Sequence, residues 1–96
     1  MGTKIWSPIC ITSTAFQRMA NYEGECATAR ACEVMNRTPL VLSSWATTSN
    51  EDVGVAAPNC VKVMQLYMSK IPEVNLDIWA RIKKSGFTAL ALTTDT

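Results

Sequence analysis

The 96-residue sequence contains no histidine, and this absence excludes several kinds of catalytic site from this stretch of chain. A Ser-His or Cys-His nucleophile and an imidazole general base all need a histidine to take up the proton. Glycine-rich phosphate loops of the GxGxxG or Walker type are also missing. A dinucleotide-binding fold of the Rossmann type is therefore not expected.

Long apolar runs and an excess of charge of one sign are missing as well. No apolar stretch approaches the roughly 20 residues that a membrane-spanning helix needs, and the first residues lack the apolar centre of a signal peptide. The formal net charge is +1, and no basic run occurs. We therefore expect neither a membrane partner nor a nucleic-acid partner.

The four cysteines lack the spacing of a metal site, because no CxxC motif occurs. Cys26 and Cys32 lie in one predicted helix and do not share a face, whereas Cys10 and Cys60 fall in predicted buried strands. We expect small, buried side chains in a reducing compartment, with no bound metal.

Apolar segments that end in polar residues predict the strands of one small domain, or of part of a larger one. The predicted strands cover residues 7–12, 40–43, 61–67 and 88–92. Segments such as "PLVLSS" and "TALALT" are almost continuously apolar, which indicates burial on both faces, as in a parallel sheet covered by helices.

Three helices are predicted between these strands. The first covers residues 23–35 and is closed by Asn36; its buried face is expected to hold Ala27, Ala31, Val34 and Met35. The second follows an N-cap at Ser49 and runs for about two turns, weakened by Gly54 and ended by Pro58.

The third predicted helix covers residues 72–85 and ends at Gly86. Its buried stripe is expected to consist of Val74, Ile78 and Ile82. The order β-α-β-α-β-α-β suits two architectures. A doubly wound sheet would need one more unit, and a (β/α)8 barrel needs about 250 residues, of which this chain would supply under half.

Polar residues follow each predicted strand, where both architectures place their functional sites. Hydroxyl and amide groups can bond the nitrogens and carbonyls of a planar heterocycle without adding charge. Ser and Thr are also ordinary turn residues, so the pattern by itself identifies no ligand. The polar ends are residues 12–15, residues 43–47, Gln65 with Tyr67, and residues 93–95.

Five segments carry a resemblance to a known family: "ITSTAFQRMA", "EGECATARA", "LSSWATTS", "MQLYMSK" and "SGFTALALTTDT". In this order and nearly at this spacing, they resemble the FMN-dependent (S)-2-hydroxy-acid oxidases, which include glycolate oxidase. The resemblance implies that residues 1–96 are part of an FMN hydroxy-acid dehydrogenase domain. The implied fold is α/β, with parallel β/α repeats forming about half of a TIM (β/α)8 barrel and FMN at its carboxyl face.

The resemblance also implies roles for individual residues. Ser13, Thr14 and Ala15 match the segment that approaches the flavin, and Ser43, Gln65 and Thr93 match side chains that bond its ring. Tyr67 and Trp45 match substrate-binding positions, and Asp95 matches the aspartate that orients the catalytic histidine. Ser13 stands where the family usually has proline, and the turn at residues 36–39 is one residue longer than usual.

The implied reaction oxidises a small 2-hydroxy acid, such as glycolate, to a 2-oxo acid and reduces O2 to H2O2. The implied parent is a homotetramer, peroxisomal in a eukaryote and otherwise cytoplasmic. The family's catalytic histidine and two substrate-binding arginines come later in sequence. We therefore expect this stretch to be an N-terminal-half fragment that is inactive alone and binds FMN weakly or not at all.

Two alternatives stay open from the sequence. One is a non-catalytic half barrel that pairs with another half barrel. The other is a four-stranded, flavodoxin-like binder, although "TSTAFQ" lacks the phosphate-binding loop which that fold requires.

Overall fold

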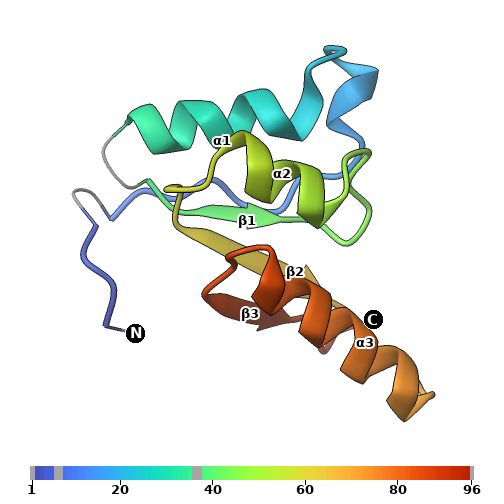
Figure 1. Cartoon of the computed structure of the whole chain (residues 1–96). Coiled ribbons are helices and arrows are strands. Elements are labelled where there is room, and N and C mark those ends of the chain that lie inside the picture. The colour runs from blue at the N-terminus through green and yellow to red at the C-terminus, as the bar shows by residue number, and fades with distance from the viewer. Residues whose placement is uncertain (1, 6–7, 36–37, 96) are drawn as a thin grey trace.

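The computed structural model describes residues 2–5, 8–35 and 38–95, and these form three parallel β/α repeats. The strands pair in the order β1-β2-β3, and both pairings are parallel. Figure 1 shows α2 and α3 in front of the strands and α1 along the upper edge of the sheet. The α/β class with parallel repeats is therefore confirmed. The elements are η1 (Gln17–Met19), α1 (Gly24–Val34), β1 (Leu40–Leu42), α2 (Asn50–Ala56), β2 (Lys62–Leu66), α3 (Pro72–Lys84) and β3 (Ala89–Leu92).

The first predicted strand is reduced to a single bridge. Ile11 pairs in parallel with Leu40, but the neighbouring described residues form no strand, and residue 7 lies outside the described part. Cys10 is exposed rather than buried, and Cys60 is buried but precedes β2, so neither lies in the strand predicted for it. One bridge satisfies two backbone groups at the edge of β1, which holds the segment beside the sheet without making it a full strand.

Side chains alternate across the sheet, and one face builds the core. Leu40 and Leu42 of β1 pack with Met64 and Leu66 of β2 in the buried cluster beneath the helices. The opposite row passes through Val41, Val63 and Ala89, which are paired neighbours and only half-buried. The helices thus cover one face of the sheet, and the other face is open among the described residues.

The buried face of α1 differs from the predicted one. Ala31, Val34 and Met35 are exposed, and Ala27 is half-buried. The buried side chains are those of Glu25, Ala29 and Cys32, which share a face at i, i+4 and i+7 spacing. The prediction failed because it considered the apolar residues alone, and the buried face includes Glu25. The predicted cap at Asn36 lies outside the described residues.

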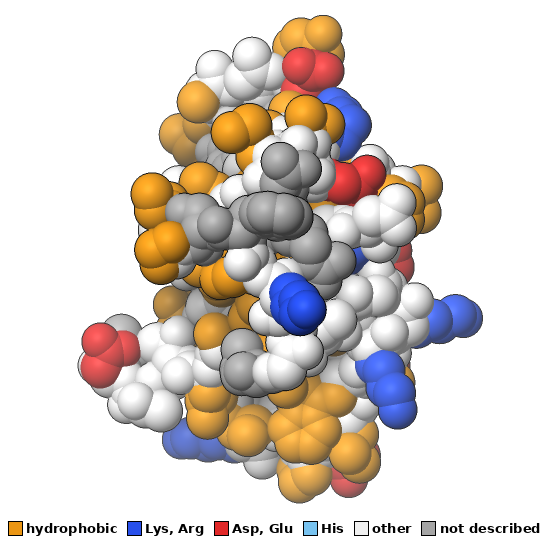
Figure 2. Space-filling view, turned by 90° about the vertical axis from the view of Figure 1, so that its left-hand side faces the viewer, with side chains coloured by type: hydrophobic (Ala, Val, Ile, Leu, Met, Phe, Trp, Pro, Cys, Tyr) orange, Lys and Arg blue, Asp and Glu red, His pale blue; other side chains and the backbone are white. Residues whose placement is uncertain are grey.

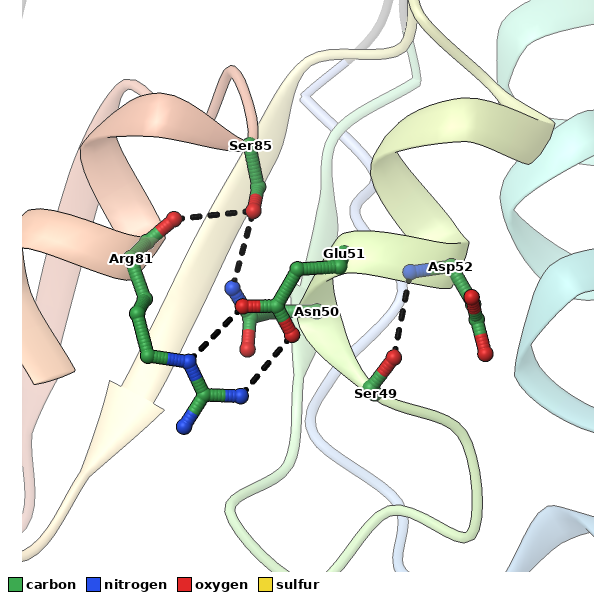
Figure 3. Close-up of polar contacts among 6 residues, drawn as sticks. All are labelled: Ser49, Asn50, Glu51, Asp52, Arg81 and Ser85. Atoms are coloured by element: carbon green, nitrogen blue, oxygen red, sulfur yellow. Dashed lines mark hydrogen bonds and ion pairs between the residues drawn. The ribbon is translucent and has the colours of Figure 1, made fainter.

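Helix α2 begins as predicted and lies unusually close to the end of α3. The hydroxyl of Ser49 accepts a hydrogen bond from the N–H of Asp52 at 3.1 Å, which caps the first turn (Figure 3). A Cβ added to Gly54 would lie 2.5 Å from the backbone oxygen of Ser85. Gly54 therefore allows a close approach that no other residue would permit.

Polar side chains join α2 to α3 across this contact. Arg81 donates from Nε and Nη2 to the two carboxylate oxygens of Glu51, at 2.8 and 2.9 Å. The amide of Asn50 donates to the hydroxyl of Ser85, which in turn donates to the carbonyl of Arg81 (Figure 3). These contacts hold the end of α3 against the start of α2.

Helix α3 keeps its predicted bounds to within one residue but buries less than predicted. Pro72 occupies its first turn, and Gly86 ends it with a φ of +86°. Ile82 is buried and Ile78 is half-buried, whereas Val74 is exposed. Figure 1 shows the first half of α3 extending away from the sheet, where no described element covers it.

A buried lysine lies at the amino end of the sheet, and sequence reasoning did not anticipate it. The side chain of Lys62 is fully buried, and its Nζ donates to the carbonyls of Ala57 at 2.8 Å and Cys60 at 3.3 Å. The ring of Phe87 lies 5.9 Å from the same nitrogen. Burial lowers the pKa of Lys62. The ammonium group satisfies carbonyls where α2 ends.

The edge strand β3 exposes apolar side chains. Leu90 and Leu92 are 49% and 52% exposed, and with Tyr67 and Trp79 they line a shallow apolar hollow of about 150 Å³. In Figure 2, hydrophobic side chains gather at the lower end of the view, at the height of β3 and α3 in Figure 1. Within the described ranges, none of the helices has the length and hydrophobicity of a membrane span.

Candidate functional site

Two of the predicted site residues, Gln65 and Thr93, meet at the carboxyl ends of consecutive strands, and Ser44, which was not predicted, joins them. Gln65, near the end of β2, donates from Nε2 to the hydroxyl of Thr93 just after β3, at 2.8 Å. Its Oε1 accepts from the N–H of Ser44 after β1, at 2.9 Å. The hydroxyl of Ser44 donates to the backbone carbonyl of Gln65. The Gln65 amide is therefore fixed in orientation and joins all three strand ends.

The direction of these hydrogen bonds leaves hydroxyl and amide donors available at the carboxyl ends of the strands, which form one rim of the sheet. Because Thr93 Oγ1 accepts from Gln65, its hydroxyl proton is available for a further acceptor. The hydroxyl of Ser43 accepts from the N–H of Trp45 at 3.0 Å, so its proton is available in the same way. Gln65 keeps a second N–H. The described contacts thus leave up to three uncharged donors from three consecutive strands.

The segment of Ser13, Thr14 and Ala15 lies beside the loop that follows β1. The N–H of Phe16 donates to the carbonyl of Trp45 at 3.3 Å, which ties the two segments together. Thr14 is exposed, and its hydroxyl donates to the carbonyl of Thr12 at 3.4 Å. Ser13 and Ala15 are half-buried. The structure thus brings this segment to the rim that carries Ser43.

The remaining predicted residues have exposed side chains that make no hydrogen bond to Gln65. Trp45 is 58% and Tyr67 43% exposed, and Asp95 is exposed two residues beyond Thr93. No hydrogen bond or ion pair between described residues joins Tyr67 or Asp95 to the cluster. The same described ranges contain no group of three acidic, cysteine or histidine residues that could hold a metal ion.

Sequence reasoning missed Glu25, a fully buried carboxylate that accepts four hydrogen bonds. Its Oε2 accepts from the N–H groups of Gln17 and Thr47, at 3.1 and 3.0 Å. Its Oε1 accepts from the hydroxyls of Thr47 and Thr48, at 2.8 and 2.9 Å. The carboxylate therefore fastens the segment after Ile11 to the loop after β1.

The pKa of Glu25 reflects these bonds. Burial alone would raise it, but the hydrogen bonds from Thr47 and Gln17 outweigh burial and hold the pKa at about 2, below the ordinary value of 4.5. Glu25 is thus ionised at neutral pH. The signal that could have found it is the helical spacing that it shares with the buried residues Ala29 and Cys32.

Phe16 is the second residue that sequence reasoning passed over. It adopts the left-handed conformation, with φ 54° and ψ 46°, which is uncommon for a bulky residue. Its ring centroid lies 6.4 Å from that of Trp45, and the two rings are tilted by 57°. A tilted pair at this distance is a favourable aromatic contact.

Comparison with known proteins identifies consistent relatives. A family model described as FMN-dependent dehydrogenase matches residues 1–96. The chain is 45% identical to 2-hydroxyacid oxidase 1 of Mus musculus and 46% identical to glycolate oxidase of Spinacia oleracea, each over 96 residues. These matches cover 100% of this chain and 26% of each relative, so the chain spans about a quarter of their length.

The fold also matches solved structures. The flavin-binding domain of baker's yeast flavocytochrome b2 superposes with a TM-score of 0.91 at 29% identity, covering 99% of this chain and 25% of that one. A lactate oxidase from Pediococcus acidilactici, described as putative, gives a TM-score of 0.89 at 27% identity, covering 98% and 27%. This agreement supports the predicted partial barrel.

Proposed function

Because the chain belongs to the family of FMN-dependent dehydrogenases, we propose that it forms part of an oxidase of (S)-2-hydroxy acids. The reaction converts an acid such as glycolate to its 2-oxo acid and reduces O2 to H2O2. The relatives named 2-hydroxyacid oxidase and glycolate oxidase support this choice within the family. Residues 1–96 are then one part of the FMN-binding domain.

The donor set at the strand ends carries the proposal. The isoalloxazine ring of FMN presents carbonyl oxygens and an imine nitrogen along one edge, and all of these accept hydrogen bonds. Ser43, Gln65 and Thr93 offer uncharged donors there, and the Gln65 amide is already fixed by its own bonds. The residues present therefore fit this cofactor, which accepts the two electrons of the substrate when it is bound.

The other predicted residues take complementary roles. Ser13, Thr14 and Ala15 approach the flavin from the side of the Ile11 segment. Tyr67 binds the substrate through its phenol group, because a neutral hydroxyl can donate to a carboxylate or bond a hydroxyl. Trp45 contacts the substrate from the loop after β1.

Asp95 acts through a histidine that these 96 residues do not supply. A carboxylate beside an imidazole stabilises the imidazolium that forms when the substrate hydroxyl loses its proton. The exposure of Asp95 at the same sheet edge as Thr93 leaves room for such a partner. The whole enzyme is proposed to be a homotetramer, peroxisomal in a eukaryotic cell and otherwise cytoplasmic.

The test uses the longest natural polypeptide that carries these residues. Flavin absorbance of the purified protein and peroxide release on glycolate are measured for the unmodified protein, Gln65→Leu and Asn59→Leu. Gln65→Leu is expected to weaken FMN binding about tenfold or more, because it removes a donor and leaves Ser44 N–H without its acceptor. Asn59 is exposed and serves as the matched amide control. Absence of both flavin and peroxide from the unmodified protein would refute the proposal.

A second candidate is a non-catalytic half barrel that pairs with another half barrel. The exposed leucines of β3, Leu90 and Leu92, favour it: they are in register with Met64 and Leu66 on the face that the helices cover, so a helix of the partner half barrel would cover them. Light scattering after size exclusion discriminates the two. A discrete dimer without flavin supports pairing, whereas a flavin-loaded, peroxide-releasing protein supports the oxidase.

A further inference from the structure

The left-handed backbone at Phe16 sets the position of its ring against the ring of Trp45. A left-handed conformation at a bulky residue persists only where its surroundings hold it, and such strain gathers at functional sites. Here it turns the chain so that the Phe16 N–H meets the Trp45 carbonyl at 3.3 Å and the two rings lie 6.4 Å apart. The strain therefore sets the position of one aromatic ring against another.

The backbone segments that carry the two rings are both hydrogen-bonded to the carboxylate of Glu25. Gln17, directly after Phe16, donates its N–H to Glu25 Oε2, and so does Thr47, two residues after Trp45. The next N–H along the chain, that of Arg18, donates to the hydroxyl of Thr47 at 3.1 Å. The two segments are therefore bound to each other at the aromatic pair and directly after it, which limits how far the rings can separate.

The pair stands beside the candidate flavin site and is not covered. Phe16 is 47% and Trp45 58% exposed, although both rings are apolar. The Trp45 N–H donates to the hydroxyl of Ser43, which belongs to the donor set. Phe16 directly follows Ala15, and Trp45 lies two residues after Ser43, so both rings lie next to candidate flavin-binding residues. A fixed apolar wall next to a few converging polar groups is how small-molecule sites are built.

We infer that Phe16 is a specificity-determining residue, whose ring, with that of Trp45, limits the length of the side chain on the 2-hydroxy acid. The inference rests on the proposed function and deepens it. The group that contacts the two rings is the alkyl group of the substrate, on the carbon that carries the hydroxyl. A glycolate molecule has no such group, whereas longer 2-hydroxy acids must place theirs against the wall.

The experiment compares Phe16→Gly, Phe16→Leu and Met19→Ala in the longest natural polypeptide, loaded with FMN. Glycine tolerates the left-handed backbone and removes the ring, and leucine keeps apolar bulk without it. Met19 is 84% exposed in the adjacent turn and serves as the control. The readouts are kcat/KM for 2-hydroxyhexanoate and glycolate, and the dissociation constants of the two 2-oxo products by calorimetry.

Phe16→Gly is expected to raise the 2-hydroxyhexanoate-to-glycolate ratio of kcat/KM about tenfold, which is the size of effect that a reshaped apolar pocket produces. Phe16→Leu is expected to raise it less, and Met19→Ala to leave it unchanged. The affinity for 2-oxohexanoate should rise in parallel.

Two failures are distinguishable. A ratio and product affinities that stay unchanged in a Phe16→Gly protein with normal flavin content overturn the inference alone. If Phe16→Gly does not retain flavin, an unchanged ratio in Phe16→Leu overturns it instead. An unmodified protein that oxidises neither acid refutes the proposed function, and the inference with it.

Discussion

The two fully buried charged side chains of the described residues, Glu25 and Lys62, lie at opposite ends of the sheet. Glu25 accepts hydrogen bonds from two loops at the carboxyl end, and Lys62 donates to the carbonyls that follow α2 at the amino end. Burying either charge costs free energy that only such partners offset. The difference is in what they fasten: Glu25 positions loops that carry the candidate site, whereas Lys62 completes a helix end.

The effects of Glu25 and Lys62 on stability and on FMN affinity should therefore be separable by experiment. Changes at the carboxyl end should alter both stability and FMN affinity. Changes at the amino end should alter stability alone, in keeping with the division of labour in β/α barrels.

The largest effect is expected for Glu25→Gln. The new amide group must face N–H and hydroxyl donors, so about 3 kcal/mol of unfolding free energy is lost at pH 7. FMN affinity should fall at least about tenfold, because the loops of Phe16 and Trp45 lose their common anchor. Urea unfolding and flavin titration measure the two quantities. An unchanged FMN affinity would contradict the role of Glu25 in positioning the loops of the candidate site.

The pH dependence gives a second check on Glu25. Its pKa of about 2 lies below the ordinary 4.5, so the stabilisation is complete above pH 4.5 and is lost as the pH falls toward 2. The stability difference between the unmodified protein and Glu25→Gln should therefore shrink across that window. A difference that stays constant between pH 5 and pH 2 would show that the carboxylate charge is not responsible.

Gly54→Ala is expected to have the next largest effect. The added methyl group would meet the Ser85 backbone oxygen at 2.5 Å, so α2 and α3 must separate, at a cost of about 2 kcal/mol. Val55→Ala, at an exposed position of the same helix, is the control. Thermal unfolding measures the loss, and FMN affinity should stay constant. A Gly54→Ala protein as stable as the control would contradict the close contact.

Lys62→Met is expected to cost less, about 1 kcal/mol at pH 7, because an apolar chain of similar length refills the space while three carbonyls lose a donor. Burial lowers the pKa of Lys62 below its ordinary 10.5, so the unfolded chain binds the proton more tightly. The unmodified protein should therefore gain stability relative to Lys62→Met as the pH rises toward 10.5. Urea unfolding at several pH values measures this, and the opposite slope would contradict it.

The smallest effect is expected for Glu51→Gln, which breaks the ion pair with Arg81. Both side chains are about half exposed, at 44% and 51%, so solvent screens the pair. The bond from Arg81 lowers the pKa of Glu51 to about 2, but this converts to little stability at an exposed site. A loss of about 0.5 kcal/mol or less is expected from urea unfolding. A loss as large as that of Gly54→Ala would show that the pair, rather than the close backbone contact, joins the helices.

The parts of the fold that follow local rules were predictable from the sequence. The cap at Ser49, Pro72 in the first turn of α3 and Gly86 after its end all act within a few residues of their own position. The strand ends that hold Gln65 and Thr93 were predictable from where apolar runs give way to polar residues. The resemblance then supplied roles that spacing alone could not.

The buried charges were not predictable in this way, because the free energy of burial depends on partners that lie far away in sequence. Thr47 and Thr48 lie 22 and 23 residues from Glu25. The left-handed backbone of Phe16 likewise depends on Trp45, which no local pattern connects to it. Sequence reasoning therefore found the donors of the candidate site but missed the groups that hold its loops.

The exposed row on β3 has a consequence for handling the protein. Residues 88–94 contain no charge and no proline, and Leu90 and Leu92 are about half exposed. Short segments of this kind can stack in register with identical copies and form dry amyloid-like zippers. At high concentration, the solubility of this stretch should thus depend on how well β3 is shielded. A single lysine in place of Leu90 would act as a gatekeeper against such stacking.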